Sequence, residues 1–299
     1  MALEMPKVPG VDHRFVAAGD LTLHLAVAGE GEPVLLVHGW PEHWYAWRDV
    51  LVRLAARREA LAVDLRGFGW SDIAWRGVDV ETMAADLAAL ISALEADRLP
   101  VVAHDTGAAV AFELAVRHPE LVERLVVVGA PPPWAAPSLA GPALRRLARH
   151  LLVASPVGYA LLNRGLGLPA RQVRGGVAAP EKLDPDALAL YVRDLRASTR
   201  ARAGRLLNRA LVTRELGGRS RRAWGERRLE APTLALLGER DRLVDAEAFA
   251  GAERFASDLR AETVPQVGHY LPEEAPEAVA ERTLAFLAGD YEPAAAGVD

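Results

Sequence analysis

Short, continuous runs of apolar residues limit the fold of this chain more than any other feature of its sequence. Most of these runs lack the polar–apolar alternation of a half-exposed strand, so they suit strands buried on both faces of a parallel sheet. The sequence around Gly19 and Asp20 instead predicts an antiparallel hairpin at the start of the sheet. The predicted strands span residues 21–28, 33–38, 60–64, 100–104, 125–128, 233–237 and 260–264.

Between these runs, apolar side chains recur every three or four residues, as they do on the buried face of a helix. Two such series are Met83, Leu87, Leu90, Ile91 and Leu94, and Ala109, Phe112 and Val116. The alternation of strand and helix predicts a doubly wound α/β sheet. The chain has 299 residues, 51% of them hydrophobic and 25% charged, which is an ordinary composition for a folded globular protein.

The alternation breaks in the second third of the chain. Three prolines, Pro131, Pro132 and Pro133, interrupt it, and strand-like sequence resumes only at Pro232. The sequence in between is rich in Ala, Leu and Arg, which predicts helices. We therefore expect a helical domain over residues 131–228, inserted into a core made of residues 1–130 and 229–299.

The inserted segment also differs from the rest of the chain in charge. Residues 145–228 contain 18 Arg and 1 Lys against 6 Asp and Glu, whereas the whole chain has a net charge of −5. We interpret these arginines as solvated helix faces that pair with the acidic remainder; the alternative is a dedicated anion-binding surface. The net charge lacks the basic excess of a general nucleic-acid binder, so we expect no nucleic-acid partner.

Several chemistries are excluded because the chain has no cysteine. Disulfides, thiol nucleophiles, iron–sulfur clusters and cysteine-ligated zinc all require one, and we expect neither a metal nor another cofactor.

The N-terminal sequence MALEMPKVPG lacks the basic start and apolar region of a secretory signal. Prolines break the longest uncharged stretch, residues 125–144. The sequence therefore predicts a cytoplasmic protein without a membrane span.

The most informative segment is VVAHDTGA, residues 101–108. It joins an apolar strand to a helix through a sharp turn, and the small residues Ala103 and Gly107 allow that turn to be strained. Such a nucleophile elbow would present Asp105 at the carboxyl edge of the sheet, in front of a helix N-terminus. The other common role of an aspartate at this place is to cap the helix.

Three further motifs follow other predicted strands in a fixed order. HGWPE begins at His38, GERD ends at Asp241, and VGHY carries His269. These motifs, together with the elbow, resemble the α/β-hydrolase superfamily over about residues 11–287. The aspartate at the elbow, with HGWPEHW and DLRGFGWSD, resembles the branch of epoxide hydrolases and haloalkane dehalogenases.

The resemblance implies an α/β-hydrolase fold, in which a mostly parallel doubly wound sheet carries residues 131–228 as a helical cap domain. It also implies a catalytic triad of Asp105, Asp241 and His269. Glu239 and Asp245 are the rival acids in sequence, but Asp241 best matches the loop position of the family.

The implied chemistry suits an aspartate. A carboxylate with a usual pKa of about 3.9 is already ionised at neutral pH, so Asp105 can attack a saturated carbon without a base. The resulting alkyl ester must then be hydrolysed, and His269, oriented by Asp241, can act as the base on water. The backbone N–H groups of Trp40 and Thr106 resemble the oxyanion hole of the family.

The chain departs from both enzyme classes at positions that contact the leaving group. Epoxide hydrolases usually carry two cap tyrosines that donate to the epoxide oxygen, whereas His150 and Asn208 stand at those positions here. We expect His150 and Asn208 to project over Asp105 and to replace the tyrosines as donors to the leaving oxygen or halide; the alternative is that they are ordinary helix residues. Tyr159 and Tyr191 are the other cap candidates. Dehalogenases typically place Trp after the nucleophile, and fluoroacetate-type relatives place Arg there, whereas this chain has Thr106.

We therefore predict a hydrolase that acts on a small, apolar, electrophilic substrate through an ester on Asp105, with conversion of an epoxide to a diol as the expected reaction. The alternatives are a dehalogenase of alkyl halides and a non-catalytic, ligand-binding relative. The complete triad argues against the second alternative, because a binding module has no need of it. The sequence leaves open whether the protein is a monomer or a homodimer.

Overall fold

The computed structural model describes residues 4–73, 76–135, 140–216, 224, 227–289 and 291. The strands are β1 (Asp12–Ala18), β2 (Leu21–Ala28), β3 (Pro33–Val37), β4 (Glu59–Val63), β5 (Leu99–His104), β6 (Val122–Val128), β7 (Thr233–Gly238) and β8 (Leu259–Val264). The α-helices are α1 (Arg48–Leu54), α2 (Val80–Ala93), α3 (Thr106–Arg117), α4 (Gly141–Ala154), α5 (Pro156–Asn163), α6 (Leu168–Gly176), α7 (Pro185–Asp194), α8 (Ser198–Leu216), α10 (Leu271–Glu274) and α11 (Pro276–Ala288). The 3₁₀ turns are η1 (Trp44–Trp47), η2 (Pro180–Lys182), η3 (Ala246–Phe249) and η4 (Ala252–Arg254).

The described strands form one sheet in the order β1-β2-β4-β3-β5-β6-β7-β8. β2 pairs antiparallel with both β1 and β4. The remaining pairs are parallel. The predicted N-terminal hairpin and the doubly wound α/β sheet are both confirmed.

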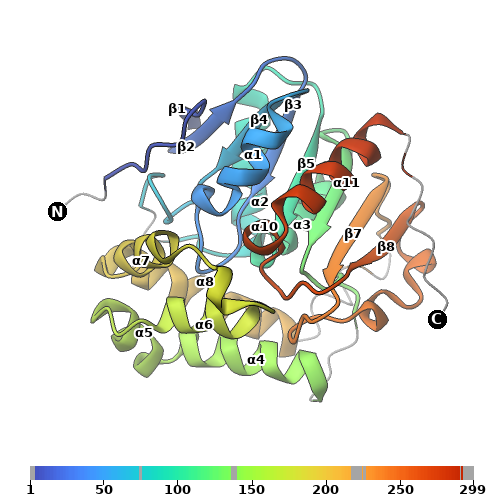
Figure 1. Ribbon diagram of the computed structural model, residues 1–299. Helices are drawn as coiled ribbons and strands as arrows, with labels where there is room; N and C mark the ends of the chain where they lie inside the picture. The colour runs from blue at the N-terminus through green and yellow to red at the C-terminus, as the bar shows by residue number, and fades with distance from the viewer. Residues whose placement is uncertain are drawn as a thin grey trace.

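The sheet is buried between two layers of helices (Figure 1). One apolar cluster includes α2 and α3, and the other includes α1 and α11. Strand β3 shows why its sequence is continuously apolar: Leu35 and Val37 belong to the first cluster, whereas Val34 and Leu36 belong to the second. Successive side chains of a strand point to opposite faces, so a strand covered on both faces needs apolar residues at every position.

Helices α4 to α8 follow β6 in the chain and precede β7, within the segment predicted to form the cap domain. In Figure 1 they form a separate layer below the sheet. Helices α6 and α7 share an apolar cluster with Tyr270, which follows β8. The predicted limits of this domain, at residues 131 and 228, remain a prediction. Among the residues described above, no helix combines the length and apolarity needed to cross a membrane.

Asp64, which follows β4, joins three segments of the core. Its fully buried carboxylate accepts hydrogen bonds from the backbone N–H groups of Trp44 at 2.7 Å and Trp70 at 2.9 Å. The same carboxylate lies 2.8 Å from Nδ1 of His24 on β2. Burial opposes its charge, but the hydrogen bond and positive charge of His24 hold the pKa of Asp64 below its usual range.

We expect Asp64→Ala to lower the free energy of unfolding by about 3 kcal/mol, because the substitution leaves buried donors without an acceptor. Urea unfolding at pH 7 measures the change. Asp97→Ala, at an exposed position, is the control and should change stability by less than about 0.5 kcal/mol. Equal stability of the two variants would show that the network around Asp64 does not stabilise the core.

Candidate active site

The three residues predicted to form a triad lie at one edge of the sheet. Asp105 follows β5, Asp241 follows β7, and His269 follows β8. These strands are connected through parallel pairs, so their carboxyl ends point in the same direction. The structure brings the three side chains together although 164 residues separate the first from the last.

Asp105 has the strained backbone that the elbow pattern predicts. Its φ of 47° and ψ of −119° lie in a region that side-chain-bearing residues rarely adopt. Two glycines make room for it. A Cβ on Gly39 would lie 2.6 Å from Cβ of Asp105, and a Cβ on Gly107 would lie 2.3 Å from the carbonyl oxygen of His38. Glycine is therefore needed at both positions, because a Cβ at either one would prevent the turn at His38 and Gly39 from packing closely against the turn at Asp105.

Asp241 orients His269. Nδ1 of His269 donates to Oδ2 of Asp241 at 2.9 Å. Oδ1 of Asp241 is itself fixed by the backbone N–H groups of Leu243 at 2.7 Å and Val244 at 3.3 Å. This arrangement places Nε2 of His269 3.4 Å from Oδ1 of Asp105, which is an ion-pair distance rather than a short hydrogen bond.

The electrostatics of the site keep both partners charged. Burial disfavours the ionised carboxylate, but Arg149 and His269 outweigh it and hold the pKa of Asp105 well below its usual range. Burial likewise disfavours an imidazolium, but Asp241 and Asp105 raise the pKa of His269 to about 9. In the resting site at neutral pH, Asp105 is therefore an anion and His269 a cation.

One carboxylate oxygen of Asp105 lies beside Trp40, whose backbone N–H was expected to form part of an oxyanion hole. The backbone N–H of Trp40 donates to Oδ2 at 3.3 Å. Thr106 is the first residue of α3, so its N–H has no acceptor within the helix and lies at the positive end of the helix dipole.

Arg149 is the residue that sequence reasoning missed. Its Nη2 donates to Oδ2 of Asp105 at 3.2 Å and to the backbone oxygen of Trp40 at 2.5 Å. The Arg149 side chain is only 8% exposed. It comes from α4, 44 residues after Asp105. The one available signal was its position next to His150, which was expected to face Asp105.

The structure corrects the predicted role of His150. The backbone oxygen of Gly204 accepts from Nδ2 of Asn208 at 2.8 Å, which fixes the orientation of the amide. Oδ1 of Asn208 then faces Nδ1 of His150 at 2.7 Å, so Nδ1 carries the proton. Burial and the charge of Arg149 lower the pKa of His150 to about 4. The ring is therefore neutral at pH 7 and its Nε2 is an acceptor, so His150 does not replace a tyrosine hydroxyl as a donor, whereas Asn208 keeps a second amide N–H.

The two cap tyrosines are placed differently from each other. The hydroxyl of Tyr191 donates to Glu273 at the start of α10. Tyr159 is partly buried and packs against an apolar cluster of the core. Nε1 of Trp40 is buried and makes no hydrogen bond with the described residues. A Cβ on Gly204 of α8 would lie 2.7 Å from this indole nitrogen, so the nitrogen is directed toward the helical layer.

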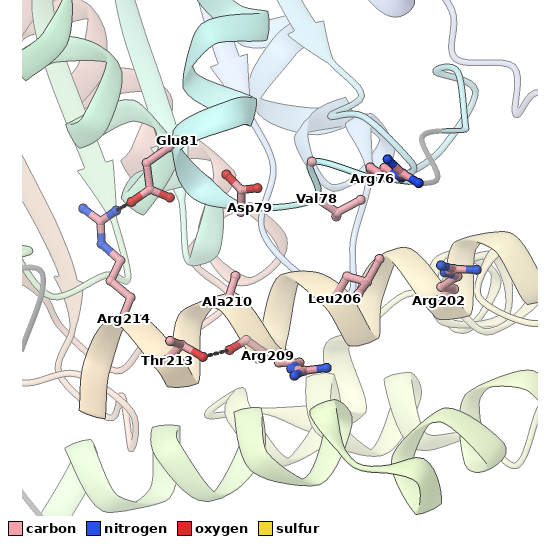
Figure 2. Close-up of a pocket in the computed structure, with 11 residues that line it drawn as sticks. Arg76, Val78, Asp79, Glu81, Arg202, Leu206, Arg209, Ala210, Thr213 and Arg214 are labelled. Atoms are coloured by element: carbon pink, nitrogen blue, oxygen red, sulfur yellow. Dashed lines mark hydrogen bonds and ion pairs between the residues drawn. The ribbon is translucent and has the colours of Figure 1, made fainter. Parts of the chain in front are cut away.

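A hollow lies away from the triad residues, between the chain leading into α2 and helix α8 (Figure 2). Its volume is about 510 Å³. Arg214 closes one end by donating to Glu81 at 2.8 Å, and it also donates to Glu113 at 2.7 Å. Such pairs between helix α8 and acids of the core agree with our interpretation of the arginine-rich segment.

No group of three or more His, Asp or Glu side chains able to hold a metal ion occurs among the residues that the structure describes.

Comparison with known proteins places this geometry in a family. Residues 32–276 match the family model described as alpha/beta hydrolase fold. The chain belongs to the α/β-hydrolase family. The soluble epoxide hydrolase of Corynebacterium sp. (strain C12) is 30% identical, with 93% of this chain and 98% of that protein aligned. Epoxide hydrolase 3 of Xenopus tropicalis is also 30% identical, over 95% of this chain and 77% of that protein.

A solved structure supports the same relationship. The structure of the epoxide hydrolase CorEH without ligand superposes with a TM-score of 0.83 at 30% identity, covering 93% of this chain and 99% of that one. This α/β-hydrolase is thus an epoxide hydrolase-like enzyme, and the resemblance and fold class expected from the sequence are confirmed.

The charged state of His269 predicts how stability depends on pH. Its pKa is raised in the folded protein, so its stabilising effect is complete below pH 6.5, the usual pKa, and is lost as the pH rises through about 9. Relative to the His269→Gln variant, we expect the free energy of unfolding to fall by about 3 kcal/mol over that interval. Urea unfolding at pH 6, 7.5 and 9 measures this.

The exposed His118→Gln variant is the control and should follow the parent protein at every pH. A constant difference between the parent protein and His269→Gln from pH 6 to pH 9 would contradict the assignment of a protonated His269.

Proposed function

We propose that this enzyme hydrolyses an epoxide to a diol through a covalent alkyl ester on Asp105. The observation that carries the proposal is the position of the Asp105 carboxylate, which lies between the backbone N–H of Trp40 and Nε2 of His269 at the strained elbow. The similarity to proteins named epoxide hydrolases, at about 30% identity over most of the chain, supports the same reaction class.

In the first step, Oδ1 of Asp105 attacks an epoxide carbon, a C–O bond of the ring breaks, and its electron pair stays on the oxygen. The resulting alkoxide takes up a proton from solvent, and the His269 imidazolium releases its proton to solvent once Asp105 is esterified. Asp105 can do this directly because its low pKa keeps it ionised at neutral pH. The indole N–H of Trp40 is the donor available for the oxygen that leaves, because it is buried and makes no hydrogen bond with the described residues.

In the second step, water attacks Cγ of the ester and His269 accepts a proton from it. Formation of the ester is what prepares His269 for this role. Asp105 is one of the groups that raise the pKa of His269, and its negative charge disappears when it becomes an ester. The pKa of His269 then falls, and the neutral imidazole required for base catalysis becomes accessible near neutral pH.

The test separates the two steps. With styrene oxide as substrate, we expect Asp105→Ala to abolish turnover and to leave no adduct, because no nucleophile remains. We expect His269→Gln to lower turnover by at least about 10³-fold while it accumulates an ester, since it retains Asp105 but lacks the base. Mass spectrometry of the intact protein, followed by peptide mapping, locates the added mass.

Urea unfolding of each variant at pH 7 serves as the control for folding. Turnover retained by folded Asp105→Ala would overturn the nucleophile assignment. An adduct on another residue in His269→Gln would overturn the covalent mechanism on Asp105.

A further inference from the structure

We propose that Arg149 is a third, cationic donor of the oxyanion hole, which accelerates hydrolysis of the Asp105 ester but not its formation. The proposal rests on the ester mechanism given above. It assigns Arg149 to one step of that reaction rather than to binding of the intact substrate.

The two oxygens of Asp105 have different surroundings. Oδ2 accepts from Nη2 of Arg149 at 3.2 Å and from the backbone N–H of Trp40 at 3.3 Å. Oδ1 faces Nε2 of His269 at 3.4 Å. Because both donors are on Oδ2, Oδ1 is the oxygen left to attack the substrate. Once Oδ1 has formed the ester bond, Oδ2 is the carbonyl oxygen of that ester.

The guanidinium is held in place before the reaction begins. The nitrogen that contacts Oδ2 also donates to the backbone oxygen of Trp40 at 2.5 Å. Cζ of Arg149 lies 5.8 Å from the ring centres of both Trp40 and Tyr270. With 8% of the side chain exposed, this cation is largely removed from water. A fixed, desolvated charge stabilises a developing negative charge more strongly than a mobile one in solvent.

During hydrolysis of the ester, a negative charge develops on Oδ2. Water attacks Cγ, a proton passes to His269, and the π electrons of the carbonyl move to Oδ2, which becomes an oxyanion. Collapse of this intermediate restores the carbonyl and breaks the bond between Cγ and Oδ1, and the departing alkoxide takes the proton from His269. The remaining carboxyl group returns a proton to His269, so the cycle ends with an ionised Asp105 and a protonated His269. Arg149 and Trp40 donate to Oδ2 throughout.

The same cation has the opposite effect on the first step. It stabilises the free carboxylate, in agreement with the depressed pKa of Asp105, and a stabilised carboxylate is a weaker nucleophile. Arg149 is therefore expected to slow ester formation while it accelerates ester hydrolysis. A residue that only packs the helical layer against the core would not change the two rate constants in opposite directions.

The experiment measures each step by itself. Ester formation from styrene oxide is followed by quenched-flow mass spectrometry in the His269→Gln background, with and without Arg149→Met, because hydrolysis is blocked there. Ester hydrolysis is followed by single turnover with excess enzyme in the parent protein, in Arg149→Met and in Arg149→Lys. Arg145→Met removes an exposed arginine of the same helix and is the matched control.

We expect Arg149→Met to lower the rate constant of ester hydrolysis by about 100-fold, the usual effect of losing one oxyanion donor, and to leave ester formation as fast or faster. Arg149→Lys, which keeps the charge, should recover part of the hydrolytic rate, and Arg145→Met should match the parent protein.

A parallel fall of both rate constants, a loss of ester formation alone, an unchanged hydrolytic rate or a lack of recovery with Lys would each overturn the proposal. Absence of any ester in the His269→Gln background would overturn the covalent mechanism itself, and this inference with it.

Discussion

The strained backbone of Asp105 is the constraint on which the rest of the site depends. A positive φ at a residue with a side chain costs about 1–3 kcal/mol and persists only where the surroundings enforce it. Here the backbone N–H of Asp105 donates to the oxygen of Val128 on the neighbouring strand at 3.1 Å, and α3 begins at the next residue. Gly39 and Gly107 leave no side-chain atoms in the space that the turn occupies. The carboxylate is therefore held in front of a helix N-terminus, at the edge where the other strands end.

The buried charges of the site depend on one another. Asp105 is an anion paired with two cations, His269 and Arg149. Buried charges are tolerated when they are paired in this way, and removal of one partner leaves the others uncompensated. In the proposed mechanism, the pairing of these charges links the two chemical steps. Conversion of Asp105 to an ester would remove one negative charge, and the two cations would respond differently because only His269 can release a proton near neutral pH.

In the helical layer, a backbone carbonyl oxygen as well as side chains orients the polar groups. Gly204 fixes the amide of Asn208 with its carbonyl oxygen, and the amide in turn selects the tautomer of His150. On the other side of the layer, Tyr191 of α7 donates to Glu273, which also pairs with Arg48 of the core at 2.9 Å. These contacts join α8 to α4 beside Arg149, and join α7 to the core through Glu273.

The sequence by itself determined the sheet, the elbow and the order of the motifs. Continuous apolar runs specify strands buried on both faces, and the small residues around Asp105 specify a strained turn, because both are properties of a few neighbouring residues. The family relationship, read from those motifs, was confirmed by comparison. The strand order brings Asp105, Asp241 and His269 together at one edge of the sheet.

Only the tertiary structure decided which charges and donors surround Asp105. Thr106, the residue after Asp105, carries no charge, and one of the two cations that contact Asp105, Arg149, comes from α4, 44 residues further along the chain. Likewise, the types of His150 and Asn208 allow either a donor or an acceptor, and the carbonyl oxygen of Gly204 settled the choice. Helical periodicity shows which face of a helix is apolar, but the packing of one helix against another determines which side-chain atoms meet, and that packing involves the whole chain.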